Sequence, residues 1–200
     1  MHADPPATQR SLFRPMPKAR AERHRLFFAL MPEDDVRQRL HQLAGWLQDQ
    51  HPELRARWVK PERYHATLNF LGDYPALPDE AIERAIAAAN NLRASAFDGT
   101  LDFVASFRGR EPPCVARCTT VPALLSALWQ DLGMALAQAG LHQRAERQYT
   151  PHVTLAYARC ELPEPVSVEP IPWHVDRFVL IHNVVGKGHY QILGYWPLSA

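Results

Sequence analysis

The sequence has little of what marks several common protein classes. Its three cysteines, Cys114, Cys118 and Cys160, are an odd number without metal-ligand spacing, so we expect reduced thiols rather than a disulfide framework or a zinc site. No apolar run approaches the length of a membrane span, and we expect no membrane partner. Reduced thiols are typical of the cytoplasm, which is therefore the expected compartment.

A strong excess of charge is also missing. The 200 residues carry a net charge of +1, and residues 1–25 hold six basic and two acidic residues, a local charge of +4 that leaves −3 for the rest. Binding along nucleic acid needs a broad cationic surface. The sequence therefore favours a small nucleotide, or a phosphate-bearing end of RNA or of an oligonucleotide, as the partner.

The composition, 46% hydrophobic and 22% charged, is typical of a soluble globular domain. Residues 1–24 contain four prolines and scattered polar residues, and we expect a flexible basic N-terminal extension there. An arginine-rich organelle-targeting segment is the alternative, but prolines oppose the amphipathic helix that such a segment needs. Residues 25–200 are expected to form a single bilobal domain, with a monomer as the default.

One short pattern occurs twice, 87 residues apart. It reads His-Ala-Thr-Leu at His65–Leu68 and His-Val-Thr-Leu at His152–Leu155, and an aromatic residue stands five positions after each histidine. Side chains on a β-strand alternate between the two faces, so each His and Thr would share one face while the other two residues pack into a core. One copy alone is compatible with a structural histidine. Two copies predict a polar cleft lined by two histidines and two threonines.

These side chains suit phosphoryl transfer to water without a metal. An imidazole with an ordinary pKa of about 6.5 serves as a base in one copy and as an acid in the other near neutral pH. The hydroxyls of Thr67 and Thr154 would donate hydrogen bonds to the non-bridging oxygens of a phosphate. No pattern such as His-Glu-x-x-His is present, so we expect no metal and no other cofactor.

The order of periodic segments predicts an α+β fold. Apolar residues recur at helical spacing in three segments, 32–50, 78–92 and 122–139. Strand-like segments are 25–30, 58–59, 64–71, 97–107, 114–119, 150–158, 175–185 and 189–198. A proline-rich loop is expected over 163–172. This mixed order favours two similar lobes of mainly antiparallel sheet with outer helices and a cleft between them.

From about residue 25 to residue 198, the chain resembles the two-histidine (2H) phosphoesterase superfamily, and within it the RNA 2′,3′-cyclic phosphodiesterases, also called 2′-5′ RNA ligases. The resemblance rests on four segments, Leu26–Leu30, Tyr64–Gly72, Pro151–Leu155 and Tyr190–Leu198. It implies metal-independent hydrolysis of a terminal 2′,3′-cyclic phosphate to a 2′-phosphate. It also implies that His65 donates a proton to the departing ribose oxygen and that His152 accepts one from water, two roles that the residues themselves leave open.

The resemblance is weakest where the substrate is held. Members of the family often carry an arginine five residues after the second histidine, where this chain has Tyr157. Arg159 is the candidate phosphate ligand, with a solvated arginine at a strand end as the alternative. Phe28 is the candidate for stacking on a nucleobase, against the alternative that Phe27 and Phe28 are core residues. Four more residues are open as RNA contacts: Arg144, Arg147, His182 and His189.

The leading hypothesis is therefore metal-independent hydrolysis of 2′,3′-cyclic phosphate ends of RNA or oligonucleotides. A related activity of the superfamily, 2′-5′ RNA ligation or hydrolysis of ADP-ribose cyclic phosphate, is one alternative. A non-catalytic module that binds RNA ends is another, and it would bind its ligand without turnover.

Overall fold

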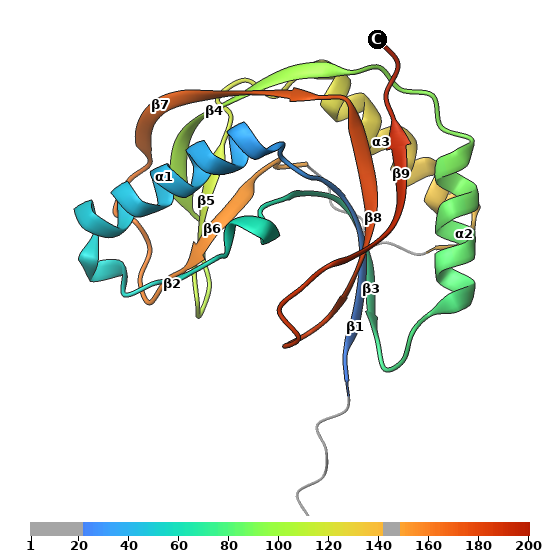
Figure 1. Ribbon diagram of the computed structural model, residues 1–200, viewed down its shortest axis with the longest axis horizontal. Coiled ribbons are helices and arrows are strands. Elements are labelled where there is room, and N and C mark those ends of the chain that lie inside the picture. Colours follow the sequence, from blue (N-terminus) through green and yellow to red (C-terminus); the bar gives the residue numbers. More distant parts are fainter. Residues whose placement is uncertain (1–21, 142–148) are drawn as a thin grey trace, which may run out of the picture.

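The structure is a computed structural model that describes residues 22–141 and 149–200 (Figure 1). Most of the expected N-terminal extension lies outside the described residues, and so do Arg144 and Arg147. The described helices and strands are β1 (His24–Leu30), α1 (Asp34–Gln50), β2 (Arg57–Trp58), β3 (Ala66–Tyr74), α2 (Asp79–Asn90), β4 (Phe97–Ser106), β5 (Pro113–Arg117), α3 (Ala123–Gln138), β6 (Val153–Tyr157), β7 (Val166–Val175), β8 (Arg177–Val184) and β9 (Gln191–Pro197). The pairings between these strands are antiparallel, which confirms the predicted α+β class.

The sheet runs in the order β7-β4-β5-β6-β3-β1-β8-β9, with β2 paired to β6. The central strands β6 and β3 share a single residue pair, Ala66 opposite Val153, so the sheet divides there into two lobes (Figure 1). We call β1, β3, β8 and β9 with α2 and α3 the first lobe, and β2, β4, β5, β6 and β7 with α1 the second lobe. The two motif strands are thus the strands at which the lobes join.

Helices α1 and α3 each pack in the lobe opposite to the one that contains a strand adjacent to them in the sequence. Helix α1 follows β1 but packs against β7 and β6 of the second lobe, burying Val36, Leu40 and Leu47. Helix α3 precedes β6 but packs against β3 and α2 of the first lobe. Each lobe therefore contains segments from both halves of the chain, and the two motif strands are held by the same continuous fold.

The expectation of a proline-rich loop over 163–172 is wrong, because Val166–Val175 is strand β7. Proline lacks the N–H that a central strand needs, but an edge strand tolerates it. Strand β7 is such an edge, with β4 as its only neighbour in the sheet among the described strands. Pro172 lies opposite Thr100 of β4, and a register shift between Leu101 and Phe103 takes up part of the irregularity.

The three predicted helices are confirmed with slightly shorter ends. Asp34 and Asp35 lie in the first turn of α1, where negative charge is favoured by the helix dipole. Helix α3 buries a leucine stripe at helical spacing, Leu125, Leu128, Leu132 and Leu136. None of the helices in the described ranges is both long and apolar enough to span a membrane.

Candidate active site

The predicted alternation of both motif strands is confirmed. Ala66 and Leu68 are 4% exposed and Val153 and Leu155 are fully buried, so these side chains face the core. The two histidines and two threonines between them are half-buried on the opposite face. We call this face of β3 and β6, which carries His65, Thr67, His152 and Thr154, the polar face.

The antiparallel pairing of the motif strands brings the two motifs together in a crossed arrangement. If the register at Ala66 and Val153 is extended by one residue each way, His65 lies opposite Thr154 and Thr67 lies opposite His152. Directly opposed residues have Cβ atoms about 5 Å apart. This extended register brings each histidine to the threonine of the other motif, although the two motifs are far apart in sequence.

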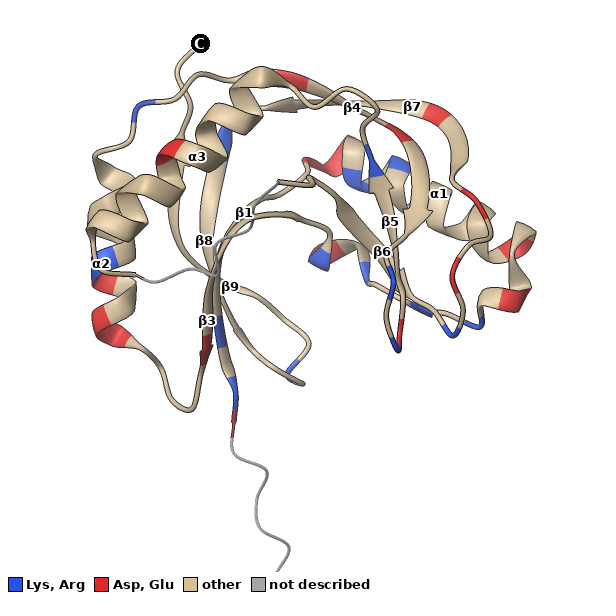
Figure 2. Cartoon of the chain, turned by 180° about the vertical axis from the view of Figure 1, so that it is seen from behind, with Lys and Arg blue, Asp and Glu red and all other residues tan. Residues whose placement is uncertain are grey.

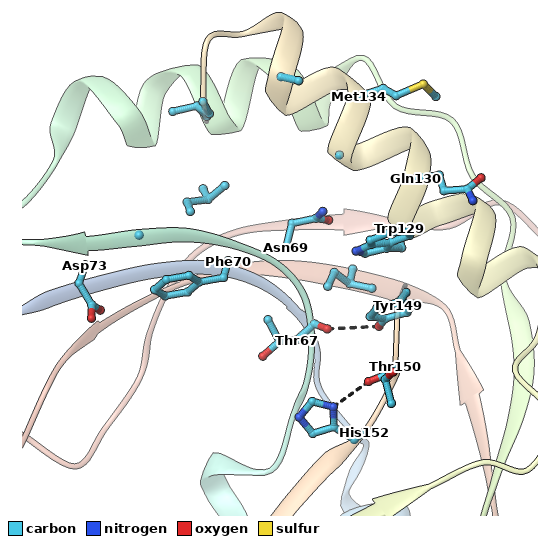
Figure 3. A pocket seen from close by; sticks show the side chains of 16 residues that line it. Thr67, Asn69, Phe70, Asp73, Trp129, Gln130, Met134, Tyr149, Thr150 and His152 are labelled. Atoms are coloured by element: carbon cyan, nitrogen blue, oxygen red, sulfur yellow. Dashed lines mark hydrogen bonds between the residues drawn. The ribbon is translucent and has the colours of Figure 1, made fainter. Parts of the chain in front are cut away.

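Both imidazoles are held in the same orientation by the backbone. Nδ1 of His65 lies 2.8 Å from the carbonyl oxygen of Arg63, and Nδ1 of His152 lies 2.8 Å from the carbonyl oxygen of Thr150 (Figure 3). A carbonyl only accepts hydrogen bonds, so Nδ1 carries the proton and donates it in both cases. Nε2 is consequently the nitrogen of each ring that accepts or delivers a proton in acid–base chemistry.

His65 is enclosed by aromatic rings of the first lobe. The centroids of the Phe27 and Tyr190 rings lie 5.1 Å and 5.4 Å from that of His65. Burial lowers the pKa of His65 to about 4, and the nearby His152 lowers it further, against the bond to the Arg63 carbonyl. His65 is thus neutral at pH 7 in the free protein, the form that can accept a proton rather than donate one.

The surroundings of His152 differ. The Phe107 ring meets the His152 ring edge-on, with centroids 4.8 Å apart. The β5–β6 register places Arg117 beside His152 on the polar face, and the Arg117 guanidinium lies 5.8 Å from the centre of the Phe107 ring. Nε of Arg117 is buried and has no hydrogen-bond partner within the described residues. A positive charge therefore lies next to the second histidine.

Arg63 has the equivalent place beside the first histidine. Its guanidinium lies 4.8 Å from the centre of the Tyr190 ring and donates to the Tyr190 hydroxyl at 3.3 Å. Each histidine thus has an arginine stacked on the aromatic ring that it touches. Nothing local in the sequence marks Arg63 or Arg117 as a functional residue, and Tyr190 was expected only as the start of a closing strand.

A β-bulge occurs at the leucine of each motif and changes which residues reach the polar face. The β1–β3 pairing omits Leu68, and the β5–β6 pairing omits Leu155. A bulge reverses the alternation beyond it. Phe70 and Tyr157, five residues after each histidine, are therefore 42% and 37% exposed. Figure 3 shows Phe70 on the same side of β3 as Thr67.

The structure does not bring Phe28 and Arg159, the candidate substrate contacts, to the site. Phe28 is fully buried against Phe178 and Trp196, with ring centroids 5.9 Å and 5.5 Å away, so the expectation that it stacks on a base is wrong. Arg159 is exposed beyond the end of β6, seven residues or roughly 23 Å of strand from His152. That distance exceeds the reach of an arginine side chain, so Arg159 does not meet a phosphate held by the histidines.

His182 and His189, which the sequence left open as RNA contacts, lie outside the polar face. His182 is 6% exposed and hydrogen-bonds His24 and Gln191, while His189 is exposed in the turn before β9. Within residues 22–141 and 149–200, no three His, Cys, Asp or Glu side chains form a group suited to a metal ion.

An open pocket extends from Thr67 and His152 to α3 (Figure 3). Trp129 and Tyr149 stack there with ring centroids 5.1 Å apart, and the Tyr149 hydroxyl donates to the Thr67 carbonyl at 3.2 Å. Nothing in the sequence marks Trp129 as a functional residue, since a tryptophan on an apolar helix is usually part of the core. The structure thus offers an aromatic-lined space next to the polar face.

Known proteins are similar to this chain in both sequence and fold. A family model described as LigT like Phosphoesterase matches residues 30–116. The RNA 2′,3′-cyclic phosphodiesterase of Escherichia coli (strain K12) is 28% identical over 185 residues, which cover 90% of this chain and 99% of that protein. The crystal structure of E. coli LigT complexed with 3′-AMP matches with a TM-score of 0.74 at 25% identity, over 90% of this chain and 100% of that chain.

A second structure of the same relative, E. coli LigT complexed with NADP+, gives a TM-score of 0.72 at 26% identity, over 90% and 99% of the two chains. The family model covers residues 30–116, and the curated relative and the solved structures extend the similarity to 90% of this chain. The chain is thus similar, in sequence and in fold, to LigT-like phosphoesterases.

Proposed function

We propose that the protein hydrolyses 2′,3′-cyclic phosphates at RNA or oligonucleotide ends to 2′-phosphates, without a metal ion. The observation that carries this proposal is the matched pair of imidazoles, each fixed through Nδ1 to a backbone carbonyl two residues earlier and each one residue from the Ala66–Val153 pair at which the motif strands meet. The E. coli relative named RNA 2′,3′-cyclic phosphodiesterase supports the substrate class.

In the proposed reaction, Nε2 of His152 accepts a proton from water as the water oxygen bonds to phosphorus. The bond between phosphorus and the ribose 3′ oxygen breaks, and Nε2 of His65 donates the proton that this oxygen needs. Thr67 and Thr154 donate hydrogen bonds to the non-bridging oxygens, which carry the negative charge. Arg63 and Arg117 add positive charge around the same group.

The protonation of His65 is coupled to substrate binding in this mechanism. Its pKa of about 4 leaves it neutral in the free protein, whereas an acid must be protonated. A cyclic phosphate carries a negative charge, and a negative charge close to an imidazole favours its protonated form. We therefore expect the bound substrate to raise the pKa of His65, so that the proton is acquired in the complex.

Incubation with a short 2′,3′-cyclic phosphate oligonucleotide in excess chelator, followed by phosphorus NMR of the product, tests this function. We expect a 2′-phosphate product that is absent with His65→Ala and with His152→Ala but present with His189→Ala, a control in the exposed turn. Binding without turnover would identify an RNA-end binding module instead. Activity that requires added metal would contradict the mechanism, and a joined 2′-5′ product would indicate ligation.

We further propose that residues 25–200 act as one bilobal domain and as a monomer. The cytoplasm is the proposed compartment, since Cys114, Cys118 and Cys160 are all free thiols. Light scattering of the purified protein tests the monomer directly.

A further inference from the structure

We propose that Arg57 and Tyr157 form a second anion-binding subsite, which holds a phosphodiester group on the 5′ side of the reacting nucleotide. The subsite rests on the proposed function for the identity of the substrate, but its geometry is independent of the two histidines. It implies that the protein prefers an oligonucleotide end to a single nucleotide.

The two residues are placed together by strand pairing. Tyr157 is the last residue of β6, and Arg57 of β2 lies directly opposite it in the antiparallel register. The Arg57 guanidinium lies over the Tyr157 ring, 4.9 Å from the centroid. This contact orients the planar guanidinium while its N–H groups, which lie in the plane, stay able to donate to an anion.

Arg57 also lacks a neutralising partner. Within the described residues it is exposed and forms no ion pair or side-chain hydrogen bond. Arg25 stacks in the same way over Phe70, at the equivalent position of the first motif, but donates to both carboxylate oxygens of Asp73 at 2.9 Å and 3.2 Å. Of these two stacked arginines, Arg57 is the one whose charge is left for a ligand.

The bulge at Leu155 turns Tyr157, and Arg57 stacked on it, to the polar face that carries the histidines. The pKa of Tyr190 is raised mainly by burial, and Tyr157 also raises it through electrostatic repulsion. Tyr190 belongs to the first lobe and touches His65. Figure 2 shows that basic residues gather at the end of the second lobe beneath β5 and β6. An oligonucleotide that extends from the histidines along β6 would therefore pass Tyr157.

The distance along β6 decides which phosphate Arg57 can bind. His152 and Tyr157 are five residues apart, roughly 16 Å on an extended strand. This is too far for Arg57 to reach the phosphate held by the histidines, and it leaves room for at least one further nucleotide. The group bound by Arg57 is therefore a backbone phosphodiester, which a mononucleoside cyclic phosphate does not possess.

The first test compares two substrates. With Arg57→Gln we expect kcat/KM for a 2′,3′-cyclic phosphate tetranucleotide to fall about tenfold through KM, and kcat/KM for a mononucleoside 2′,3′-cyclic phosphate to stay within twofold. Arg84→Gln on α2 is the matched control and should change neither. Equal losses on both substrates, or no loss on either, would overturn the subsite.

The second test needs no turnover. Binding of an oligonucleotide with a terminal 2′-phosphate is measured by fluorescence anisotropy at several salt concentrations. If Arg57 neutralises one backbone phosphate, Arg57→Gln should lower the slope of log Kd against log salt by about 0.7. An unchanged slope contradicts the subsite. If the natural protein hydrolyses neither substrate, the proposed function fails, and this measurement still decides the role of Arg57.

The third test moves the charge. In the double variant Arg57→Gln/Tyr157→Arg, position 157 carries the cation on the same face, and we expect most of the oligonucleotide preference to return. Arg159→Gln should leave the preference unchanged. A loss with Arg159→Gln that matches the loss with Arg57→Gln would overturn the assignment to this face of β6.

Discussion

In the first lobe Arg25 stacks over Phe70 and is bound by Asp73, whereas in the second lobe Arg57 stacks over Tyr157 without a carboxylate partner among the described residues. The motif strands themselves are alike, with the same alternation and the same bulge at the leucine. The neighbouring strands β1 and β2 each supply one arginine, and the difference comes from Asp73, near the end of the first motif strand. The repeated pattern thus gives two similar backbones, and residues outside the pattern make one copy neutral and the other cationic.

The histidines show the same division. Both bond the carbonyl two residues earlier, yet His65 lies between Phe27 and Tyr190 whereas His152 meets Phe107 beside Arg117. Identical motifs therefore acquire different electrostatic surroundings, which an acid–base pair requires if one member is to donate and the other to accept a proton. The following predictions test how far the two copies are equivalent.

The largest effect is expected from the histidines. His65→Ala or His152→Ala should each lower kcat by about 10³-fold, because each removes one of the two proton transfers. The double variant should be little worse than either single variant, since the two act in one step. Losses that multiply would show that the two histidines act independently.

The threonines test the symmetry of phosphate binding. Thr67→Val and Thr154→Val should each reduce kcat by about 10²-fold, because each removes one hydrogen bond to an oxygen that gains charge in the transition state. Steady-state kinetics with circular dichroism as a folding control measures this. A large loss for one threonine alone would show that a single motif holds the phosphate.

The stability of the protein should depend on the protonation of His65. Its pKa is about 4 when folded, below the ordinary 6.5 of an unfolded chain, so protonation favours unfolding. The contribution is fully present above pH 6.5 and is lost as the pH falls towards 4, by at most about 3 kcal/mol. Urea unfolding across this range should show the loss for the natural protein and for His189→Gln, and a smaller loss for His65→Gln.

The pH dependence of the rate compares the two histidines directly. The profile of kcat/KM should be bell-shaped, because one histidine must be neutral and the other protonated. Its acidic limb should fall near pH 4, the pKa of His65 in the free protein, and the same limb in the profile of kcat should lie at higher pH once phosphate is bound. An acidic limb near 6.5 in kcat/KM would contradict the burial of His65.

The smallest effect concerns Asp73. Asp73→Asn should release Arg25 and make the first lobe more like the second, so the affinity for a phosphorylated oligonucleotide should rise about threefold. The salt dependence of Kd should steepen in parallel. A decrease in affinity would show that the ion pair between Arg25 and Asp73 positions β1 or β3 for binding.

Much of the site was predictable because strand alternation is a local property. The faces of His65, Thr67, His152 and Thr154 followed from the period of two, and the helices followed from apolar spacing. Strand alternation alone was not enough where packing against neighbouring strands decides which side chain is buried. Phe27 and Phe28 were indistinguishable in sequence, and only the packing of Phe28 on β8 and β9 shows that it belongs to the core.

Sequence by itself determined the two imidazole–hydroxyl pairs and the core beneath them, since these depend only on side-chain periodicity within a strand. Tertiary structure alone decided the rest: the bulges that turn Phe70 and Tyr157 onto the polar face, and the arginines that stack there. A bulge depends on register with a partner strand, and a stacked cation depends on which strand lies alongside. Both are long-range choices, set by how β1, β2 and β5 pair with the motif strands.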